Sequence, residues 1–315
     1  MKVVVAIDSF KGSMTSMQAG NACKEGILAA AHAHCGSGAA AAKDRKPAAD
    51  NMKVVVKPLA DGGEGTVEAL VEGMSGTYEY VPVTGPMGNP VKARYGILPD
   101  QTVVMEMAEA SGITLVKEPL NPWKAASTGV GEMILDAVQK GCRKFIIGIG
   151  GSATTEGGIG MLSALGYDFM DENGDILPPV FASLEKVVQI ENNRVPEMLK
   201  DCHFQIACDV TNPLCGVEGC VYVFGAQKGV KEEEKESMDR AMQSYAACME
   251  KFTGKKFSEI PGTGAAGGLG FAFLWGLPNV ELKPGIDIVL EAVGLASELQ
   301  DADIVVTGEG CLDFQ

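Results

Sequence analysis

A glycine-rich segment at residues 145–160, FIIGIGGSATTEGGIG, holds the largest group of residues that could do chemistry. An apolar strand ends there in a turn that opens a helix. Glycines let a ligand approach the backbone closely, and N–H groups at a helix start favour negative charge, so we predict a phosphate-binding loop. The residues predicted to contact phosphate are Gly150, Gly151, Ser152, Thr154, Thr155, Gly157 and Gly158.

Two known phosphate loops fit this segment poorly. A Walker A loop ends in Gly-Lys-Ser/Thr, and no lysine occurs between Lys144 and Lys186. Residues 148–153, GIGGSA, match the dinucleotide pattern G-x-G-x-x-A, which also requires a second parallel strand ending in an acid about 20 residues later. Residues 167–177, YDFMDENGDIL, instead have the Asn-Gly centre of a hairpin turn. An NAD(P)-dependent oxidoreductase is therefore the second hypothesis, and a turn without a ligand is the structural alternative.

Acids, hydroxyls and a lysine follow other short apolar runs that are typical of buried parallel strands. They are Asp8, Ser9 and Lys11 after residues 2–7, Asp61 and Glu64 after 53–57, and Asp209 and Asn212 after 204–207. Because ligands of open α/β sheets bind beyond the carboxyl ends of the strands, we expect these side chains to face one crevice. Carboxylates among glycines suit metal coordination, and helix capping is their structural alternative.

Composition narrows the chemistry. The chain has 315 residues, a net charge of −15 and three histidines, His32, His34 and His203. The charge argues against nucleic acid or an anionic membrane as a partner, and an anionic substrate would need local positive potential. Few histidines disfavour a Ser-His-Asp mechanism, so we expect carboxylates, lysines and a metal ion. Nine cysteines without a C-x-x-C pair and a start without a signal pattern predict a cytoplasmic protein with reduced thiols.

The pattern of elements predicts an α/β fold of two α/β domains with the active site in the cleft between them. We expect residues 1–76 plus 285–315 to form a discontinuous Rossmann-like domain with a parallel sheet, and residues 77–284 to form an inserted mixed α/β domain that carries the glycine-rich phosphate loop. Short antiparallel strands are expected at 78–83, 91–98 and 102–107, and a final strand at 302–307. Residues 228–240, KGVKEEEKESMDR, are charged throughout and predict the solvated face of a helix. The chain stops in a loop after a strand, so we expect the natural protein to continue.

Taken together, these loops resemble those of the bacterial glycerate kinase family. The matching segments, in order, are AIDSFKGS, PLADGGEGT, GIGGSATTEGGIGML, CDVTNPLCG, PGTGAAGGLG and VVTGEGCLD. The resemblance implies Mg²⁺-dependent transfer of the γ-phosphoryl group of ATP to a hydroxyl of D-glycerate. It implies 2-phosphoglycerate as the product, with 3-phosphoglycerate less favoured. A non-catalytic small-anion sensor is the alternative from another class, and a homodimer is left open.

We expect each group of residues to have a role in this reaction. Lys11, Asp8 and Asp209 are the predicted catalytic residues, and Ser9, Asp61, Glu64 and Asn212 are the predicted substrate-binding residues. Asp61, Glu64 and Asp209 are predicted to share metal binding and proton abstraction. Phosphoryl transfer mainly requires positioning and charge neutralisation, which such groups provide without histidine.

Overall fold

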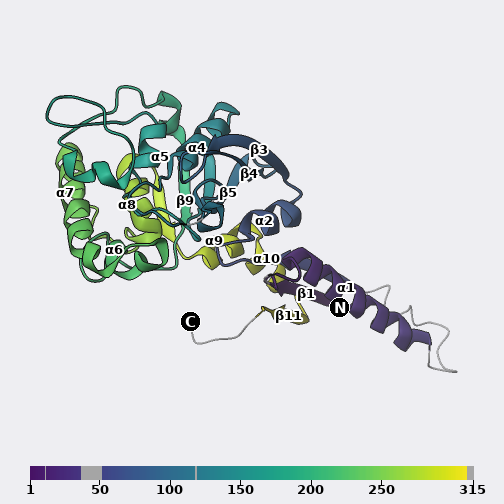
Figure 1. The fold of residues 1–315 in the computed structure, drawn as a ribbon. Helices are drawn as coiled ribbons and strands as arrows, with labels where there is room; N and C mark the ends of the chain where they lie inside the picture. Colours follow the sequence, from purple (N-terminus) through teal and green to yellow (C-terminus); the bar gives the residue numbers. More distant parts are fainter. Residues whose placement is uncertain (11, 37–51, 118, 311–315) are drawn as a thin grey trace.

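The computed structural model describes residues 1–10, 12–36, 52–117 and 119–310, and helices alternate with strands over most of this length (Figure 1). In chain order the elements are β1 (Lys2–Ile7), α1 (Ser16–Gly36), β2 (Lys53–Pro58), α2 (Thr66–Met74), β3 (Thr77–Thr84), β4 (Pro90–Ile97), β5 (Thr102–Glu106), α3 (Ala108–Ser111), α4 (Thr128–Gln139), β6 (Lys144–Gly148), α5 (Ile159–Ala164), β7 (Asp168–Met170), β8 (Gln189–Glu191), β9 (His203–Ala207), α6 (Cys220–Phe224), α7 (Lys235–Thr253), α8 (Ala265–Gly276), β10 (Val280–Lys283), α9 (Gly285–Ala292), α10 (Leu295–Leu299) and β11 (Ile304–Gly308).

Two main sheets organise the chain. The smaller sheet has the order β11-β1-β2 and is parallel throughout. The larger sheet has the order β10-β9-β6-β5-β4-β3, in which β5, β6, β9 and β10 are parallel while β4 and β3 are antiparallel additions. Since parallel strands run in one direction, the carboxyl ends of β5, β6, β9 and β10 share one edge of the larger sheet. That edge is where a ligand is expected.

The helices between and around the sheets explain why the parallel strands are apolar. Along β1, Val3 and Val5 belong to one buried core and Val4 and Ala6 to another, as the alternation of side chains along a strand requires. The second core also contains residues of α2 and α9 and Ile146 of β6. Thus α2 and α9 join the two sheets, and α1 extends from the smaller sheet away from the rest of the chain (Figure 1).

The opposite face of the larger sheet packs against α4, α5, α7 and α8 in the largest core. Phe145 of β6 and Phe204 of β9 stack there with ring centroids 4.8 Å apart, and both are 1% exposed. Aromatic side chains bury a large apolar area, so this face anchors the two strands whose ends form the glycine-rich loop and the Asp209 loop.

The structure confirms the α/β class and the positions of the expected strands. The strands at residues 78–83, 91–98 and 102–107 occur as β3, β4 and β5, and they pair in antiparallel fashion as predicted. The Asn-Gly turn also occurs, with the N–H of Gly174 donating to the carbonyl of Asp171 at 3.0 Å. The chain leaves the smaller sheet after β2 and enters the larger sheet at β3, and it returns to the smaller sheet at β11 after β10. These changes agree with the predicted boundaries, and the division into two domains stays a prediction. Within the described residues, no helix is both long and apolar enough to cross a membrane.

Candidate active site

A cavity of about 390 Å³ lies where the loops after β2, β6 and β9 meet, at the carboxyl edge of the larger sheet. We call it the carboxyl-edge cavity. Its lining residues are Asp61, Gly62, Gly63, Ile113, Ile149, Gly150, Gly151, Ser152, Ala207, Cys208, Asp209, Val210, Phe224, Gln227, Lys228, Ala265 and Ala266. Three of the predicted loops therefore converge, and one buried lysine joins them.

The loop after β6 presents backbone to this cavity. Gly150 and Gly151 are exposed, and Gly151 has a φ of 71°, which glycine adopts without steric penalty. The loop is also anchored, because the N–H of Ala153 donates to the carbonyl of Ser111 at 2.9 Å and that of Ile113 to the carbonyl of Gly151 at 2.9 Å. Fixed, exposed N–H groups beside a cavity can bind an anion without reorganising.

Glu156 also anchors the glycine-rich loop after β6, through hydrogen bonds. Its buried carboxylate accepts hydrogen bonds from the backbone N–H of Ser127 at 2.8 Å and of Gly160 at 3.3 Å, and the Ser127 hydroxyl also donates to it. Burial raises the pKa of Glu156, and the hydrogen bonds from Ser127 oppose that shift. The carboxylate thus ties the loop to the starts of α4 and α5, so we assign it a supporting role.

Glycines also allow the loop after β2 to reach the cavity. A Cβ on Gly62 would lie 2.6 Å from the Cα of Gly285 and 2.6 Å from the Cβ of Ala207, and Gly62 has a φ of 88°. A Cβ on Gly148 would lie 2.4 Å from the carbonyl oxygen of Gly62. No side chain fits at either contact, since real Cβ atoms do not approach neighbours this closely. The two backbones touch, and Asp61 is brought to the larger sheet.

Asp61 and Asp209 line the cavity from two different loops, and both are exposed. Asp61 Oδ1 accepts from the N–H of Gly63 at 2.8 Å, and Asp209 Oδ1 accepts from the N–H of Gly285 at 2.9 Å. Gly285 also packs on the Asp61 backbone, because its Cβ would lie 2.0 Å from the Asp61 carbonyl oxygen. The start of α9 therefore positions both carboxylates.

Lys228 was missed by the sequence analysis, and the prediction of a solvated face for residues 228–240 is wrong at this residue. It ends a short 3₁₀ helix, Ala226–Lys228, and is only 2% exposed. Its Nζ donates to Ser152 Oγ at 2.6 Å and to the carbonyl of Thr154 at 2.6 Å. Burial lowers its pKa to about 8, while Cys220 and Glu156 act in the opposite direction. The charged sequence of residues 228–240 gave no indication that Lys228, its first residue, is buried.

A second hollow of about 350 Å³ adjoins the loop at residues 61–65 and contains Ser9, Glu64, Arg94, Glu106 and Glu109 among its lining residues. Glu106 Oε1 accepts from the backbone N–H groups of Gly65 at 3.1 Å and Val67 at 3.0 Å. Burial raises the pKa of Glu106 to about 7, helped by the charge of Glu109 and opposed by the bond from Val67. The predicted acids are thus divided, with Asp61 in one cavity and Glu64 in the other.

The remaining residues of the glycine-rich loop lie beneath the surface. Thr154 and Thr155 are fully buried, and their Oγ1 atoms have no hydrogen-bond partner among the residues that the structure describes. They are buried because the second glycine-rich segment, at the start of α8, packs on them. A Cβ on Gly267 would lie 2.1 Å from the carbonyl oxygen of Thr154. Gly157 and Gly158 are likewise buried, against α7 and α8. Their contact with phosphate stays a prediction that this packing does not support.

Four further predicted residues do not line the carboxyl-edge cavity or lie outside the described residues. Asp8 and Ser9 follow β1, where the N–H of Asp8 donates to the carbonyl of Gly308 at 3.0 Å. Asn212 donates from Nδ2 to the carbonyl of Glu218 at 2.8 Å, which closes its own loop. Lys11 lies outside the described residues.

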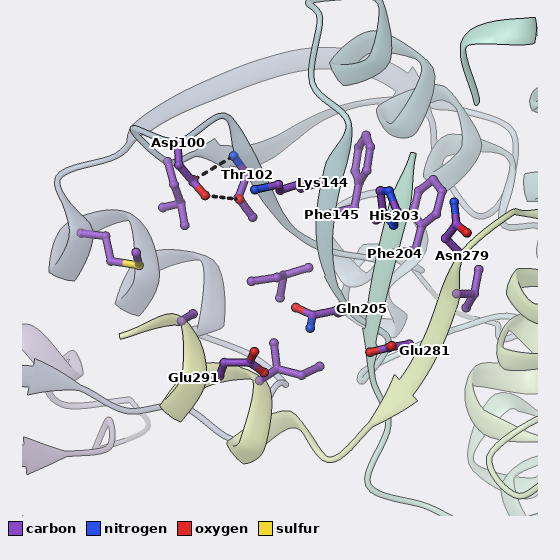
Figure 2. A pocket seen from close by; sticks show the side chains of 16 residues that line it. Asp100, Thr102, Lys144, Phe145, His203, Phe204, Gln205, Asn279, Glu281 and Glu291 are labelled. Atoms are coloured by element: carbon purple, nitrogen blue, oxygen red, sulfur yellow. Dashed lines mark hydrogen bonds between the residues drawn. The ribbon is translucent and has the colours of Figure 1, made fainter. Parts of the chain in front are cut away.

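A larger cavity of about 760 Å³ lies at the opposite edge of the same sheet, and we call it the amino-edge cavity (Figure 2). Lys144, His203 and Gln205 from β6 and β9 line it, with Glu281 beside Gln205 on β10 and Glu291 on α9. Lys144 and His203 are the first residues of their strands. This is the edge away from the glycine-rich loop, so we do not assign the chemistry to it.

Comparison with known proteins decides the family. Residues 3–315 match the model of the glycerate kinase family. This chain belongs to the glycerate kinase family. Its similar proteins include the glycerate kinase of Bacillus subtilis, 42% identical over 100% of this chain and 78% of that protein, and the glycerate 2-kinase of Escherichia coli, 40% identical over the same shares. A crystal structure assigned as glycerate kinase 2 of Salmonella typhimurium LT2 has a TM-score of 0.90 and 39% identity over 99% of this chain and 79% of that chain.

Membership of the glycerate kinase family confirms the resemblance seen in the sequence and the prediction of a kinase. It leaves the oxidoreductase hypothesis without support. The structure agrees, because β7 pairs with β8 in antiparallel fashion, whereas a dinucleotide loop requires a second parallel strand there.

Proposed function

We propose that this protein transfers the γ-phosphoryl group of ATP to a hydroxyl of D-glycerate. The observation that carries the proposal is the carboxyl-edge cavity of a glycerate kinase family member, which unites a glycine-rich loop, a buried lysine and two carboxylates. In the reaction, the bond between the γ-phosphorus and its bridging oxygen breaks and a bond to the glycerate oxygen forms. The hydroxyl proton passes to a carboxylate of the site.

The lining of the carboxyl-edge cavity fits a nucleotide. Gly150, Gly151 and Lys228 offer N–H donors on one side, which suits phosphate oxygens. Ile113, Val210 and Phe224 are among the same lining residues and suit the apolar faces of a purine. Its volume of about 390 Å³ lies within the range of roughly 300–1,000 Å³ that is usual for small-molecule sites.

Asp61 and Asp209 are the residues that would hold Mg²⁺. This ion is usually bound by one or two protein carboxylates together with substrate phosphates and water. Across the described ranges, no group of three or more His, Cys, Asp or Glu could hold a metal ion by itself. When bound, Mg²⁺ neutralises charge on the phosphate oxygens.

We place glycerate at the loop of residues 61–65, which borders both the carboxyl-edge cavity and the neighbouring hollow. Ser9 offers a hydroxyl there and Glu64 an acceptor. Arg94, whose Nε also pairs with Glu109 at 3.4 Å, offers a positive charge for the carboxylate. Glu106 is the carboxylate best matched to proton abstraction near neutral pH, since its pKa is raised to about 7. This role for Glu106 goes beyond the bases expected from the sequence.

The proposed product is 2-phosphoglycerate, because the relative from Escherichia coli is named glycerate 2-kinase. The test is a coupled assay with D-glycerate and ATP, with Mg²⁺ and with EDTA, followed by NMR of the product. We expect turnover with Mg²⁺ only and a phosphate on the 2-hydroxyl. No turnover with Mg²⁺ or with EDTA would refute the kinase assignment. A phosphate on the 3-hydroxyl would correct only the proposed product. A cytoplasmic location and a homodimer stay predictions.

A further inference from the structure

We propose that Lys228 contacts the transferring phosphate in the carboxyl-edge cavity and neutralises part of its charge. The inference rests on the proposed function, because it assigns one more residue of the same site. It also supplies what the glycine-rich loop lacks, since no lysine occurs between Lys144 and Lys186. Lys228 reaches this loop from 76 residues away in the sequence.

The contacts of the ammonium group leave one donor for a ligand. An ammonium has three N–H donors and no acceptor. Ser152 Oγ and the carbonyl of Thr154 each accept one, both at 2.6 Å. Among the residues that the structure describes, no third acceptor is within hydrogen-bond distance of Nζ, and Lys228 lines the cavity. The third N–H is therefore available to an anion beside Gly150 and Gly151.

Among the described residues, the charge of Lys228 has no directly paired carboxylate, and the buried Glu156 acts on it only as a nearby charge. Both of its acceptors are neutral, and no carboxylate of the described chain forms an ion pair with it. A buried ammonium without a directly paired counterion is unfavourable, and lysine is almost never fully buried unless it is paired. Burial accordingly lowers its pKa to about 8. A phosphate oxygen in the cavity would provide the missing negative charge.

The backbone around Lys228 fixes its position. Gly229 has a φ of 95°, and a Cβ there would lie 3.0 Å from the Cβ of Leu120. The N–H groups of Lys228 and Val230 both donate to the carbonyl of Gly225, at 2.9 and 3.0 Å. This closed turn directs the side chain inward. A lysine held in place beforehand loses little side-chain entropy when it binds an anion.

The test compares Lys228→Met with Lys144→Met, which removes an exposed lysine from the amino-edge cavity. Calorimetry at pH 7 with excess Mg²⁺ measures binding of ATP, tripolyphosphate and adenosine to both variants and the wild type. Because charge-assisted hydrogen bonds are strong, we expect Lys228→Met to weaken ATP and tripolyphosphate binding by about 10- to 100-fold. Adenosine binding should not change, and Lys144→Met should match the wild type. Wild-type affinity for tripolyphosphate in Lys228→Met would overturn the proposal.

A structural role for Lys228 gives a different result. In that case Lys228→Met would weaken ATP and adenosine equally, which also overturns the proposal, and Lys228→Arg would not recover tripolyphosphate binding. Thermal melting of each variant shows whether it folds, and methionine keeps most of the apolar volume of the lysine stem. The proposed function fails separately, if the wild type binds tripolyphosphate through Lys228 but does not phosphorylate glycerate.

Discussion

The two edges of the larger sheet carry cavities of opposite character. The amino-edge cavity, at about 760 Å³, is larger than the carboxyl-edge cavity, at about 390 Å³. Yet the larger one is lined by side chains of the strands and of α9, including the acids Glu281 and Glu291 (Figure 2). The smaller one is lined by loops that include the exposed Gly150 and Gly151, together with Lys228. Convergent donors, and not volume, distinguish the site suited to phosphate.

The difference follows from strand direction. At the carboxyl edge, the chain leaves β6 and β9 through loops that include Gly150, Gly151 and Asp209, which are exposed. At the amino edge, the chain enters the same strands directly at Lys144 and His203. Loops can converge on a ligand, whereas the first residues of neighbouring strands stay about 4.8 Å apart side by side. Four predictions test this comparison, from the largest effect to the smallest.

Asp209→Asn should lower kcat by about 100-fold or more, since the amide keeps an acceptor for the N–H of Gly285 but loses the charge that attracts Mg²⁺. Steady-state kinetics with varied Mg²⁺ measures this effect. The control is Asp100→Asn at the amino edge, where Asp100 accepts hydrogen bonds from the backbone and the hydroxyl of Thr102 in its own turn. An unchanged kcat in Asp209→Asn would show that Asp209 only caps the start of α9.

Gly62→Ala should lower the free energy of unfolding by about 3 kcal/mol, because the new Cβ would overlap Ala207 and Gly285 and because φ is positive. Gly88→Ala is the matched control, since Gly88 also has a positive φ, 84°, but no atom lies within 4 Å of its Cβ position. That variant should lose only about 1 kcal/mol. Urea unfolding measures both. Equal losses would contradict the close contact of the loop after β2 with the end of β9 and the start of α9.

ATP affinity should fall as the pH rises above about 8, where free Lys228 loses its proton. A bound phosphate favours the charged ammonium, so the affinity is fully present below pH 8 and decreases up to about tenfold per pH unit above it. The other ionisable groups acting on Lys228 are Cys220 and Glu156, and burial raises the pKa of both. Calorimetry from pH 6.5 to about 9.5 tests this, with Lys228→Met as a flat reference. A flat wild-type profile would contradict it.

Gln205→Leu should change kcat and KM by less than about twofold. Gln205 points into the amino-edge cavity from β9, and leucine preserves its volume there (Figure 2). The same kinetic assay measures it, alongside Asp209→Asn. A loss of more than tenfold would break the comparison, because it would give the amino edge a part in the reaction.

Local sequence patterns predicted much of the fold. The apolar runs at 2–7 and 204–207 occur as β1 and β9, and the glycine-rich segment follows β6 and opens α5. Such features depend on contacts within a few residues, namely side-chain alternation and turn chemistry. Three of the polar groups expected at strand ends, Asp61, Ser152 and Asp209, line one cavity.

Other expectations could not be resolved from the sequence. Ser152 and Thr154 are both hydroxyl residues of the glycine-rich segment, but Ser152 lines the cavity while Thr154 is buried against the start of α8. In the sequence, a glycine that lets a ligand approach cannot be told from one that lets another backbone segment approach. Gly267, which packs on Thr154, is of the second kind. The difference depends on which segment packs above, and that segment is more than 100 residues away.

The sequence by itself determined the α/β order of elements, the place of the glycine-rich loop and the family. Tertiary structure alone decided which loops share a cavity, that Glu64 lies in a different hollow from Asp61, and that Lys228 is buried at Ser152. The physical reason is range. Strands, turns and helix starts follow from neighbouring residues, whereas the surroundings of a charge depend on contacts between distant segments that form only when the cores pack.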